Sequence, residues 1–192
     1  MYPNLLESLS KHIALTPEEQ ELVCAAFKLR SVVKKECLLR PGQVFHHATF
    51  VRKGCFTMHT FDKNGKASVV QIAVEGWWVG DIYSFLTQKP SEYFVEAIES
   101  AEVLQIHHEK LEELYTRVPK MERYFRILVQ NAYITFQNRV VSSMRQTAQE
   151  RYMEFQQTRP GLEQRIPLYT IASYLGIRPE FLSRIRKRMA GR

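Results

Sequence analysis

Apolar residues near the end of the chain recur at helical spacing and predict two short helices, over residues 168–175 and 179–189. Gly176 lies between them, where a tight turn often needs a positive φ, and Pro179 stands in the first turn of the second helix, where its missing N–H costs nothing. Ala172 is small enough for the two helices to approach closely. The apolar contact points are Ile171, Leu175, Ile177, Leu182 and Ile185. This pattern predicts a helix-turn-helix.

The second of these helices has an apolar side and a charged side, because each residue advances by about 100° around the helix axis. Its apolar side carries Leu182, Ile185 and Met189. The opposite side consists of Glu180, Arg184 and Lys187, with Ser183 and Arg188 at its flanks. A charged face on an ordinary helical pair would simply be solvated. The Ala-to-Gly spacing and the five matching apolar positions instead favour a recognition helix that enters the major groove of DNA.

The positive charge of the chain is concentrated in the same region. The formal net charge is +7, yet residues 1–119 hold 13 Lys and Arg against 15 Asp and Glu. Residues 120–192 hold 14 Lys and Arg against only 5 Asp and Glu. A basic surface around the helix-turn-helix is expected if this region neutralises phosphates.

Residues 29–108 predict a compact antiparallel β domain, either a roll or a barrel, since apolar and β-branched stretches alternate with turn residues about every ten positions. The turns fall at Pro41-Gly42, Lys53-Gly54, Asp62–Gly65, Glu75-Gly76 and Gly80-Asp81. Residues 55–61 and 67–73 form the clearest hairpin, around Asn64-Gly65. Two helices precede the β domain, and Thr16 with Glu19 forms a capping box at the start of the second.

Residues 120–144 predict a long helix without Gly or Pro, preceded by a short helix that Pro119 ends and followed by another helix over residues 148–158. Apolar residues cover more than one side of the long helix, with Ile127, Ile134 and Val141 at seven-residue spacing. A central core helix would show the same pattern. Because this helix lies between a β domain and a DNA-binding motif, we favour its packing against the same helix of a second copy of the chain. The expected contacts in a homodimer are Met121, Phe125, Leu128, Ala132 and Phe136.

Cysteine usage and hydropathy point to a cytoplasmic protein. Cys24, Cys37 and Cys55 are widely spaced and odd in number, which is typical of reduced structural thiols. The first residues contain no basic segment followed by an apolar run, and no stretch approaches 18 apolar residues. We therefore expect neither export nor a membrane span.

The order of these parts resembles the cyclic-AMP receptor protein/FNR (Crp/Fnr) superfamily of bacterial transcription regulators over nearly the whole chain. Residues 171–185 carry the most specific part of the resemblance, and Pro41-Gly42, Gly54 and residues 76–81 match the β-roll turns. The resemblance implies an α+β fold: an antiparallel β-roll of the cyclic-nucleotide-binding type (a double-stranded β-helix) with flanking helices, a long dimerisation helix and a winged-type helix-turn-helix. The corresponding domains are residues 1–118, 119–144 and 145–192.

The family also implies how DNA would be read. Its base-contacting pattern is Arg-Glu followed four residues later by Arg, and Glu180 and Arg184 match the last two positions. Pro179 stands where the first Arg would be, with Arg178 just ahead, so we add Arg178 to the candidate DNA-binding residues and expect a different target sequence. Double-stranded DNA and a second copy of the chain are the expected partners, and RNA polymerase is a further candidate.

The nucleotide site of the family is altered in this chain. The nucleotide-binding members hold the ribose with Gly-Glu and neutralise the cyclic phosphate with an Arg followed by a small polar residue about ten positions later. This chain has Gly80-Asp81 and then Ser91-Glu92, and a carboxylate without a guanidinium repels a phosphate. Lys89 is a poor substitute, being a point charge beyond Pro90. We therefore do not expect cyclic AMP as the effector, and its identity stays open.

Aromatic residues gather near the expected effector pocket and could stack on a flat molecule, although such clusters are more often core. The candidate pocket residues are Trp77, Trp78, Gly80, Asp81, Tyr83, Ser91, Glu92 and Tyr93. The chain lacks the closely spaced N-terminal cysteines of the iron-sulfur members. The pairs at 46–47 and 107–108 could suggest metal or haem, but neighbours on a strand point to opposite faces, so we expect no metal site and no cofactor.

The leading interpretation is a homodimeric transcription regulator that reads a pseudo-palindromic DNA site and is not an enzyme. The main alternative is a cupin-like metal-dependent enzyme or effector-binding β-barrel, against which the chain shows no His-x-His with a following carboxylate, nucleophile elbow or phosphate loop. A sensor that acts only through protein contacts is a third reading, and the intact charged face of residues 180–187 argues against it.

Overall fold

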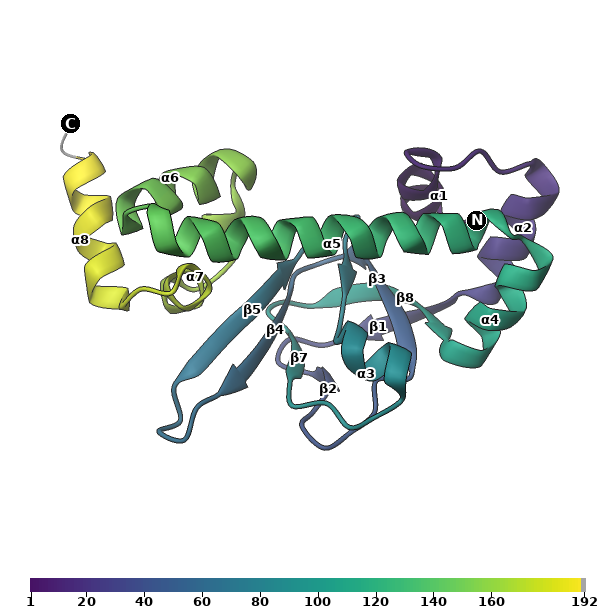
Figure 1. Ribbon diagram of the computed structural model, residues 1–192, viewed down its shortest axis with the longest axis horizontal. Coiled ribbons are helices and arrows are strands. Elements are labelled where there is room, and N and C mark those ends of the chain that lie inside the picture. The colour runs from purple at the N-terminus through teal and green to yellow at the C-terminus, as the bar shows by residue number, and fades with distance from the viewer. Residues whose placement is uncertain (191–192) are drawn as a thin grey trace. The chain divides into compact units, whose positions relative to one another are not determined.

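The computed structural model describes residues 1–190, which form two compact units (Figure 1). Unit 1 comprises Met1–His59 and Gln71–Asn131, and unit 2 comprises Thr60–Val70 and the chain from Ala132 onwards. A long helix, α5 (Lys120–Arg145), and the hairpin β4–β5 each contribute residues to both units.

Unit 1 is built around two antiparallel sheets. The first has the strand order β1-β8-β3-β6 and the second β2-β7-β4-β5. Their bounds are β1 Lys28–Val32, β2 Cys37–Leu39, β3 His47–Lys53, β4 Phe56–Phe61, β5 Ala67–Ala73, β6 Trp78–Val79, β7 Phe94–Ala97 and β8 Ala101–His107. The helices are α1 Pro3–Ser10, α2 Pro17–Ala26, α3 Ile82–Thr87, α4 His108–Arg117 and the first part of α5. The expected β domain with flanking helices is confirmed.

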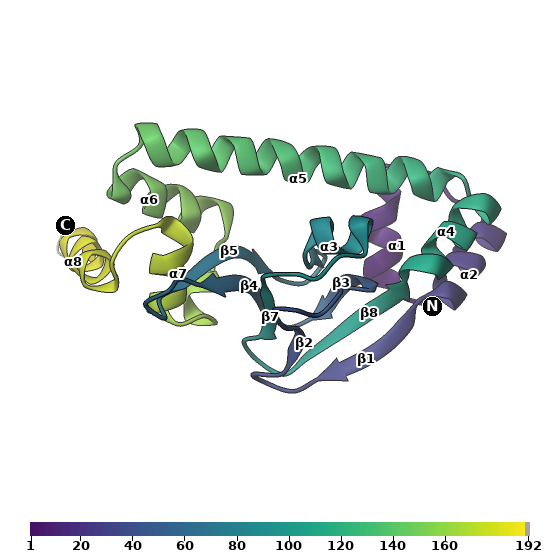
Figure 2. The ribbon, with the colours of Figure 1, turned by 60° about the horizontal axis from the view of Figure 1, so that its bottom comes forward.

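Alternation along the strands divides the core of unit 1 in two, because successive side chains point to opposite faces of a sheet. Phe50 and Leu104 are paired across β3 and β8 and face the helices, where they pack with residues of α1, α2, α4 and α5. Their neighbours Val51 and Val103 face the second sheet. Figure 2 shows α1, α2 and α4 gathered at one end of β3 and β8.

The helix cap and the hairpin turn that the sequence predicts are both present in the structure. Thr16 and Glu19 form the capping box of α2, with Thr16 N–H donating to the Glu19 carboxylate at 2.8 Å. The β4–β5 hairpin turns at Gly65, whose φ of +76° lies in the left-handed region that glycine tolerates. Asp62 Oδ1 in the same turn accepts hydrogen bonds from the backbone N–H groups of Asn64 and Lys66. The three cysteines are free thiols.

Unit 2 packs the last helices of the chain around a small apolar core. Its elements are the second part of α5, α6 Ala148–Thr158, the short 3-10 helix η1 Leu162–Gln164, α7 Leu168–Leu175 and α8 Pro179–Ala190. The buried apolar side chains that the helices and the loops between them contribute to this core are Tyr152, Phe155, Leu162, Ile166, Ile171, Ala172, Leu175, Leu182 and Ile185. Every apolar contact point expected of the helix-turn-helix is in this core except Ile177, which is half-buried.

Within residues 1–190, no helix has both the length and the apolar character needed to cross a membrane.

Candidate nucleic-acid interface and effector site

The corner between α7 and α8 follows from the residues predicted to form it. Gly176 adopts a φ of +69°, and its N–H donates to the carbonyl oxygens of Ala172 and Ser173. Ile177 N–H also returns to the carbonyl of Ala172, at 2.9 Å. These bonds satisfy carbonyls that the end of a helix leaves without a partner, and they stop α7 so that Pro179 can open α8.

Burial of one side of α8 turns the predicted polar face outward. Leu182 and Ile185 are buried, and the side chains of Arg178, Glu180, Arg184, Lys187 and Arg188 are exposed. Ser183 is half-buried, and its hydroxyl donates to the carbonyl of Pro179 at 3.1 Å, which engages its proton inside the helix. The six candidate residues therefore lie on or beside one helix, and five of them are accessible to a ligand.

The cations of this face are not neutralised by the rest of the described chain. Across residues 1–190, none of the ion pairs formed involves Arg178, Arg184, Lys187 or Arg188. The guanidinium carbon of Arg184 instead lies 5.4 Å from the ring centre of Phe181, within range of a cation–π contact. Phe181 was not among the residues expected to bind DNA, although its position three before Arg184 could have indicated it.

Helix α7, which packs against α8, is hydrogen-bonded to the first residues of β5, and both segments belong to unit 2. Ser173, in α7, donates its hydroxyl to the carbonyl of Ala67 at 2.7 Å and accepts from Val69 N–H at 3.0 Å. Arg139, in α5, donates to the carbonyls of Val69, at 3.0 Å, and Val70. A side chain of α7 thus takes the place that a neighbouring strand would fill beside β5.

Arg139 also holds α7 directly. Its Nη2 donates to the carbonyl of Tyr174 at 2.9 Å, and its guanidinium lies 4.3 Å from the centre of the Tyr174 ring. Arg159, which follows α6, donates to the Tyr174 hydroxyl at 3.0 Å. Arg151, in α6, donates to the carbonyl of Leu175 at 3.2 Å, which supplies a partner at the end of α7. Three elements, β5, α5 and α6 with its C-cap Arg159, therefore hold α7, which in turn packs against α8.

The stripe of apolar residues along α5 divides at about its middle. Met121 is fully buried in the core of its own unit, and Phe125 and Leu128 pack against the same core, so the expected contribution of Met121 to a dimer interface is wrong. Ala132 and Phe136 are exposed. The other exposed large apolar side chains of α5 are Val129, Tyr133, Ile134, Val140, Val141 and Met144. An apolar helix surface of this extent is typical of a protein interface.

In the candidate effector site, the carboxylate of Asp81 is hydrogen-bonded to the protein itself. Its Oδ1 accepts from Tyr83 N–H at 3.0 Å, which caps α3, and its Oδ2 accepts from the Ser91 hydroxyl at 2.7 Å. Ser91 is bound in turn by its backbone, donating to Gln43 and accepting from Gly42. Both Asp81 and Ser91 are buried, so the two side chains at which the resemblance leads us to expect ribose and phosphate contacts are hydrogen-bonded to each other.

A phenyl ring fills the space beside Gly80. A Cβ atom built on this glycine would lie 1.9 Å from a ring carbon of Phe45, and the backbone φ of +140° also disfavours a side chain. Phe45 is itself buried, and its N–H donates to the Ser84 hydroxyl at 3.0 Å. Close packing of aromatic and backbone atoms thus lines the expected nucleotide position.

The remaining candidate pocket residues lie in different surroundings. Trp78 belongs to the core, where its indole Nε1 donates to the Tyr124 hydroxyl at 3.0 Å and its ring meets those of Phe50 and Phe125. Trp77, Tyr83 and Glu92 are exposed, and Tyr93 is half-buried. The structure therefore assigns Trp78 to the core, and the aromatic residues do not converge around one centre.

Histidines from neighbouring strands meet because β3 and β8 place His47 opposite His107. The ring centre of His107 lies 5.2 Å from that of His47 and 5.8 Å from that of His46. Adjacent histidines on one strand point to opposite faces, but pairing between two strands still brings imidazoles from β3 and β8 close together. Even so, within residues 1–190 no three His, Cys, Asp or Glu side chains are grouped as a metal ion would require.

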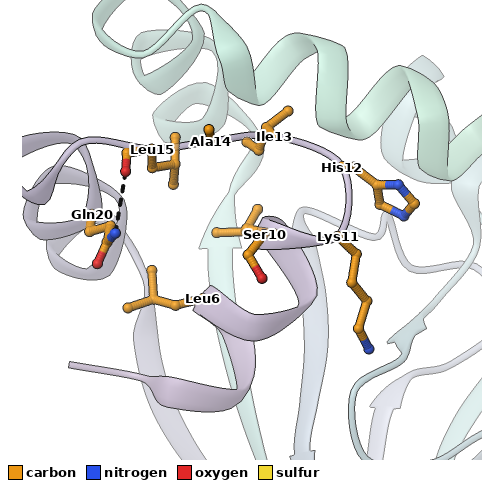
Figure 3. Close-up of a pocket in the computed structure, with 9 residues that line it drawn as sticks. Leu6, Ser10, Lys11, His12, Ile13, Ala14, Leu15 and Gln20 are labelled. Atoms are coloured by element: carbon orange, nitrogen blue, oxygen red, sulfur yellow. Dashed lines mark hydrogen bonds between the residues drawn. The ribbon is translucent and has the colours of Figure 1, made fainter.

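A shallow hollow of about 470 Å³ lies beside α1 and the loop that leads to α2 (Figure 3). Its lining comes from Leu6, Leu9, Ser10, Lys11, His12, Ile13, Ala14, Leu15 and Gln20. Along this lining, the side-chain amide of Gln20 donates a hydrogen bond to the carbonyl of Leu15 at 3.3 Å. Nothing in the sequence pattern indicated this hollow, since it is lined by helix-end and loop residues.

The chain is similar to known proteins in both sequence and structure. Residues 29–118 match the family model of the cyclic nucleotide-binding domain. The Anaerobic regulatory protein of Haemophilus influenzae is 23% identical over 167 residues, which cover 81% of this chain and 64% of that protein. The chain spans less than two thirds of the length of the curated relatives that it matches.

Solved structures share the fold at low sequence identity. The c-di-GMP responsive global regulator CLP of Xanthomonas campestris has a TM-score of 0.74 at 14% identity, with 92% of each chain covered. FixK2 from Bradyrhizobium japonicum has a TM-score of 0.72 at 16% identity, covering 86% of this chain and 85% of that chain. At these identities the structures establish the fold alone.

Proposed function

We propose that the chain is a member of the Crp/Fnr superfamily of transcription regulators and acts as a homodimeric, sequence-specific DNA-binding regulator without catalytic activity. In this proposal residues 1–118 form the sensor, residues 119–144 the dimerisation helix and residues 145–192 the DNA-binding domain. Double-stranded DNA and a second copy of the chain are its partners, and RNA polymerase is the further partner that a regulator at a promoter would meet.

The observation that carries the proposal is the outward face of α8. Five of its candidate residues are accessible, and its cations are free of ion pairs within residues 1–190. An unpaired row of guanidinium and ammonium groups on a helix that fits the major groove suits phosphates and the acceptor edge of guanine. We assign base contacts to Glu180 and Arg184 and backbone contacts to Arg178, Lys187 and Arg188.

The apolar second part of α5 supports a dimer. Phe136 and Ile134 are 59% and 51% exposed, although residues of this size are normally buried. Pairing with α5 of a second copy would remove both from water, and two copies would present two α8 helices to one duplex. The interface that we propose is centred on residues 129–144.

The packing around Asp81 and Gly80 supports an effector other than cyclic AMP. The carboxylate of Asp81 is bound to the hydroxyl of Ser91, and exposed Glu92 follows where a guanidinium would be needed. A cyclic phosphate placed there would meet a carboxylate without an opposite charge to offset it. We therefore propose that the β-roll responds to a different molecule or to a protein partner.

A binding titration tests the proposal. In vitro selection from a randomised duplex pool should yield a preferred site, and fluorescence anisotropy should show affinity that falls steeply with salt. Arg184→Ala/Lys187→Ala should lose both the preference and part of the salt slope. The control Lys28→Ala/Lys34→Ala removes the same charge from exposed positions of unit 1 and should bind like the wild type. Unchanged binding by the α8 variant would contradict the proposal.

A further inference from the structure

Phe181 stands among the cations of α8 and is 43% exposed. It shares one row of the helix surface with Arg184 and Arg188, because residues at positions i, i+3 and i+7 lie above one another. The buried side of the helix is occupied by Leu182 and Ile185, so the ring of Phe181 lies at the edge of the outward face. Part of this apolar ring is therefore open to a ligand of the outward face.

The major groove offers one apolar group to such a ring. Guanine, cytosine and adenine present hydrogen-bond donors and acceptors there, whereas thymine adds a 5-methyl group. A phenyl ring set over cytosine or guanine would desolvate polar edges without replacing their hydrogen bonds, which is unfavourable. Over thymine the ring would bury a methyl group, which is favourable.

The guanidinium of Arg184 determines which base position the preference of Phe181 for thymine would affect. The guanidinium carbon of Arg184 lies 5.4 Å from the ring centre of Phe181, so the ring limits the directions that the arginine can take. Arginine pairs with O6 and N7 of guanine through two hydrogen bonds. The ring and the guanidinium together therefore match a thymine and a guanine at neighbouring positions.

We propose that Phe181 is a specificity-determining residue that selects a thymine methyl group next to the guanine read by Arg184. This inference rests on the proposed DNA-binding function and deepens it, because it assigns one position of the target. Phe181 also acts on Arg184 as a positioning residue. Contact of the ring with the sugar–phosphate wall of the groove is the competing placement, which would strengthen binding to every sequence alike.

The test begins with the duplex selected by the wild-type protein. Each thymine of the half-site is replaced singly by deoxyuridine, which removes only the methyl group, and affinity is measured by fluorescence anisotropy. One replacement next to the critical guanine should weaken wild-type binding about fourfold, the value of one buried methyl group. Phe181→Ala should bind the thymine and deoxyuridine duplexes equally, and Phe181→Leu should retain part of the difference.

Met153→Ala serves as a matched control, because Met153 is an apolar side chain on α6 with 40% exposure, close to that of Phe181. It should keep the wild-type response to deoxyuridine. Thermal unfolding of each variant checks that α8 remains folded.

Equal wild-type binding to all thymine and deoxyuridine duplexes would overturn the inference, and so would a deoxyuridine penalty that persists in Phe181→Ala. A uniform loss of affinity in Phe181→Ala would place the ring on the sugar–phosphate wall and also overturn it. These results leave the proposed function intact if Arg184→Ala still abolishes the sequence preference. Absence of any preferred site in the wild type would contradict the proposed function itself.

Discussion

The hydroxyl of Ser173 donates a hydrogen bond to the backbone carbonyl of Ala67 at 2.7 Å, across 106 positions of sequence. The same oxygen accepts from Val69 N–H at 3.0 Å, so one side chain satisfies two backbone groups of the β5 edge. Ser173 lies in the first helix of the helix-turn-helix and Ala67 in the hairpin that leaves the β-roll. The orientation of α7 within unit 2 therefore depends on a segment that is remote in sequence.

Replacement of this serine should loosen the hairpin tip. Ser173→Ala should lower the stability of unit 2 by about 1–2 kcal/mol, because Val69 N–H loses its partner. Hydrogen exchange at the Val69 amide should accelerate, and the denaturation midpoint should fall. Ser183→Ala is the control, since the Ser183 hydroxyl donates to the carbonyl of Pro179 within its own helix. Unchanged exchange at Val69 would show that the bond does not hold the hairpin.

Stability should depend on pH through His59 in β4. His59 is buried and stacks on Phe94 with ring centres 5.3 Å apart. Burial lowers the pKa of its imidazole below the ordinary value, and the nearby carboxylate of Glu96 opposes this only partly. The unfolded chain takes up a proton near pH 6.5 and the folded chain resists it, so stability is full above about pH 6.5 and declines as the pH falls below it.

The variant His59→Phe keeps a planar ring against Phe94 but cannot be protonated. Urea denaturation between pH 7.5 and pH 5 should therefore show a smaller loss of stability for this variant than for the wild type. An identical pH dependence in His59→Phe would remove His59 as its source.

Cyclic AMP should not bind the β-roll. Isothermal titration calorimetry of the wild-type protein with cyclic AMP should give no saturable heat, because Asp81 and Ser91 are bound to each other and Phe45 packs against Gly80 where we expected the nucleotide. The DNA titration should also be unaffected by the nucleotide. Saturable binding at micromolar concentration would mean that this packing opens, and it would overturn the proposed exclusion.

The dimer should depend on the second part of α5. Ile134→Glu or Phe136→Glu should shift sedimentation from dimer to monomer, because each places a carboxylate in the proposed interface of residues 129–144. Leu86→Glu is the control, since Leu86 is 60% exposed on α3 and lies outside that interface. A dimer that survives both α5 changes would require a different interface.

Local signals in the sequence predicted most of the fold. Gly176 and Pro179 located the corner of the helix-turn-helix, and Thr16 with Glu19 located the start of α2, because caps and turns are determined by neighbouring residues. The rows of α5 also revealed an apolar helix. They could not show that Met121 packs in its own unit, since periodicity identifies an apolar side without naming what covers it.

Contacts between residues far apart in the sequence could not be predicted, and the reason is the same for each. The bond between Ser173 and Ala67 and the pairing of His47 with His107 depend on which strands and helices become neighbours. The place of Phe45 against Gly80 likewise depends on the closure of the roll. In each case the residue types were visible, but their partners are fixed only by tertiary packing.

Dimethyl sulfate footprinting on the selected duplex tests the central claim most directly, because methylation of guanine N7 reports occupation of the major groove and so DNA binding, the dimer and the reading helix together. A dimer that inserts two α8 helices should protect two patches in successive major grooves, about 10–10.5 base pairs apart from centre to centre. Arg184→Ala/Lys187→Ala should erase both patches at the same protein concentration. A single patch, or protection that persists in this variant, would contradict the account.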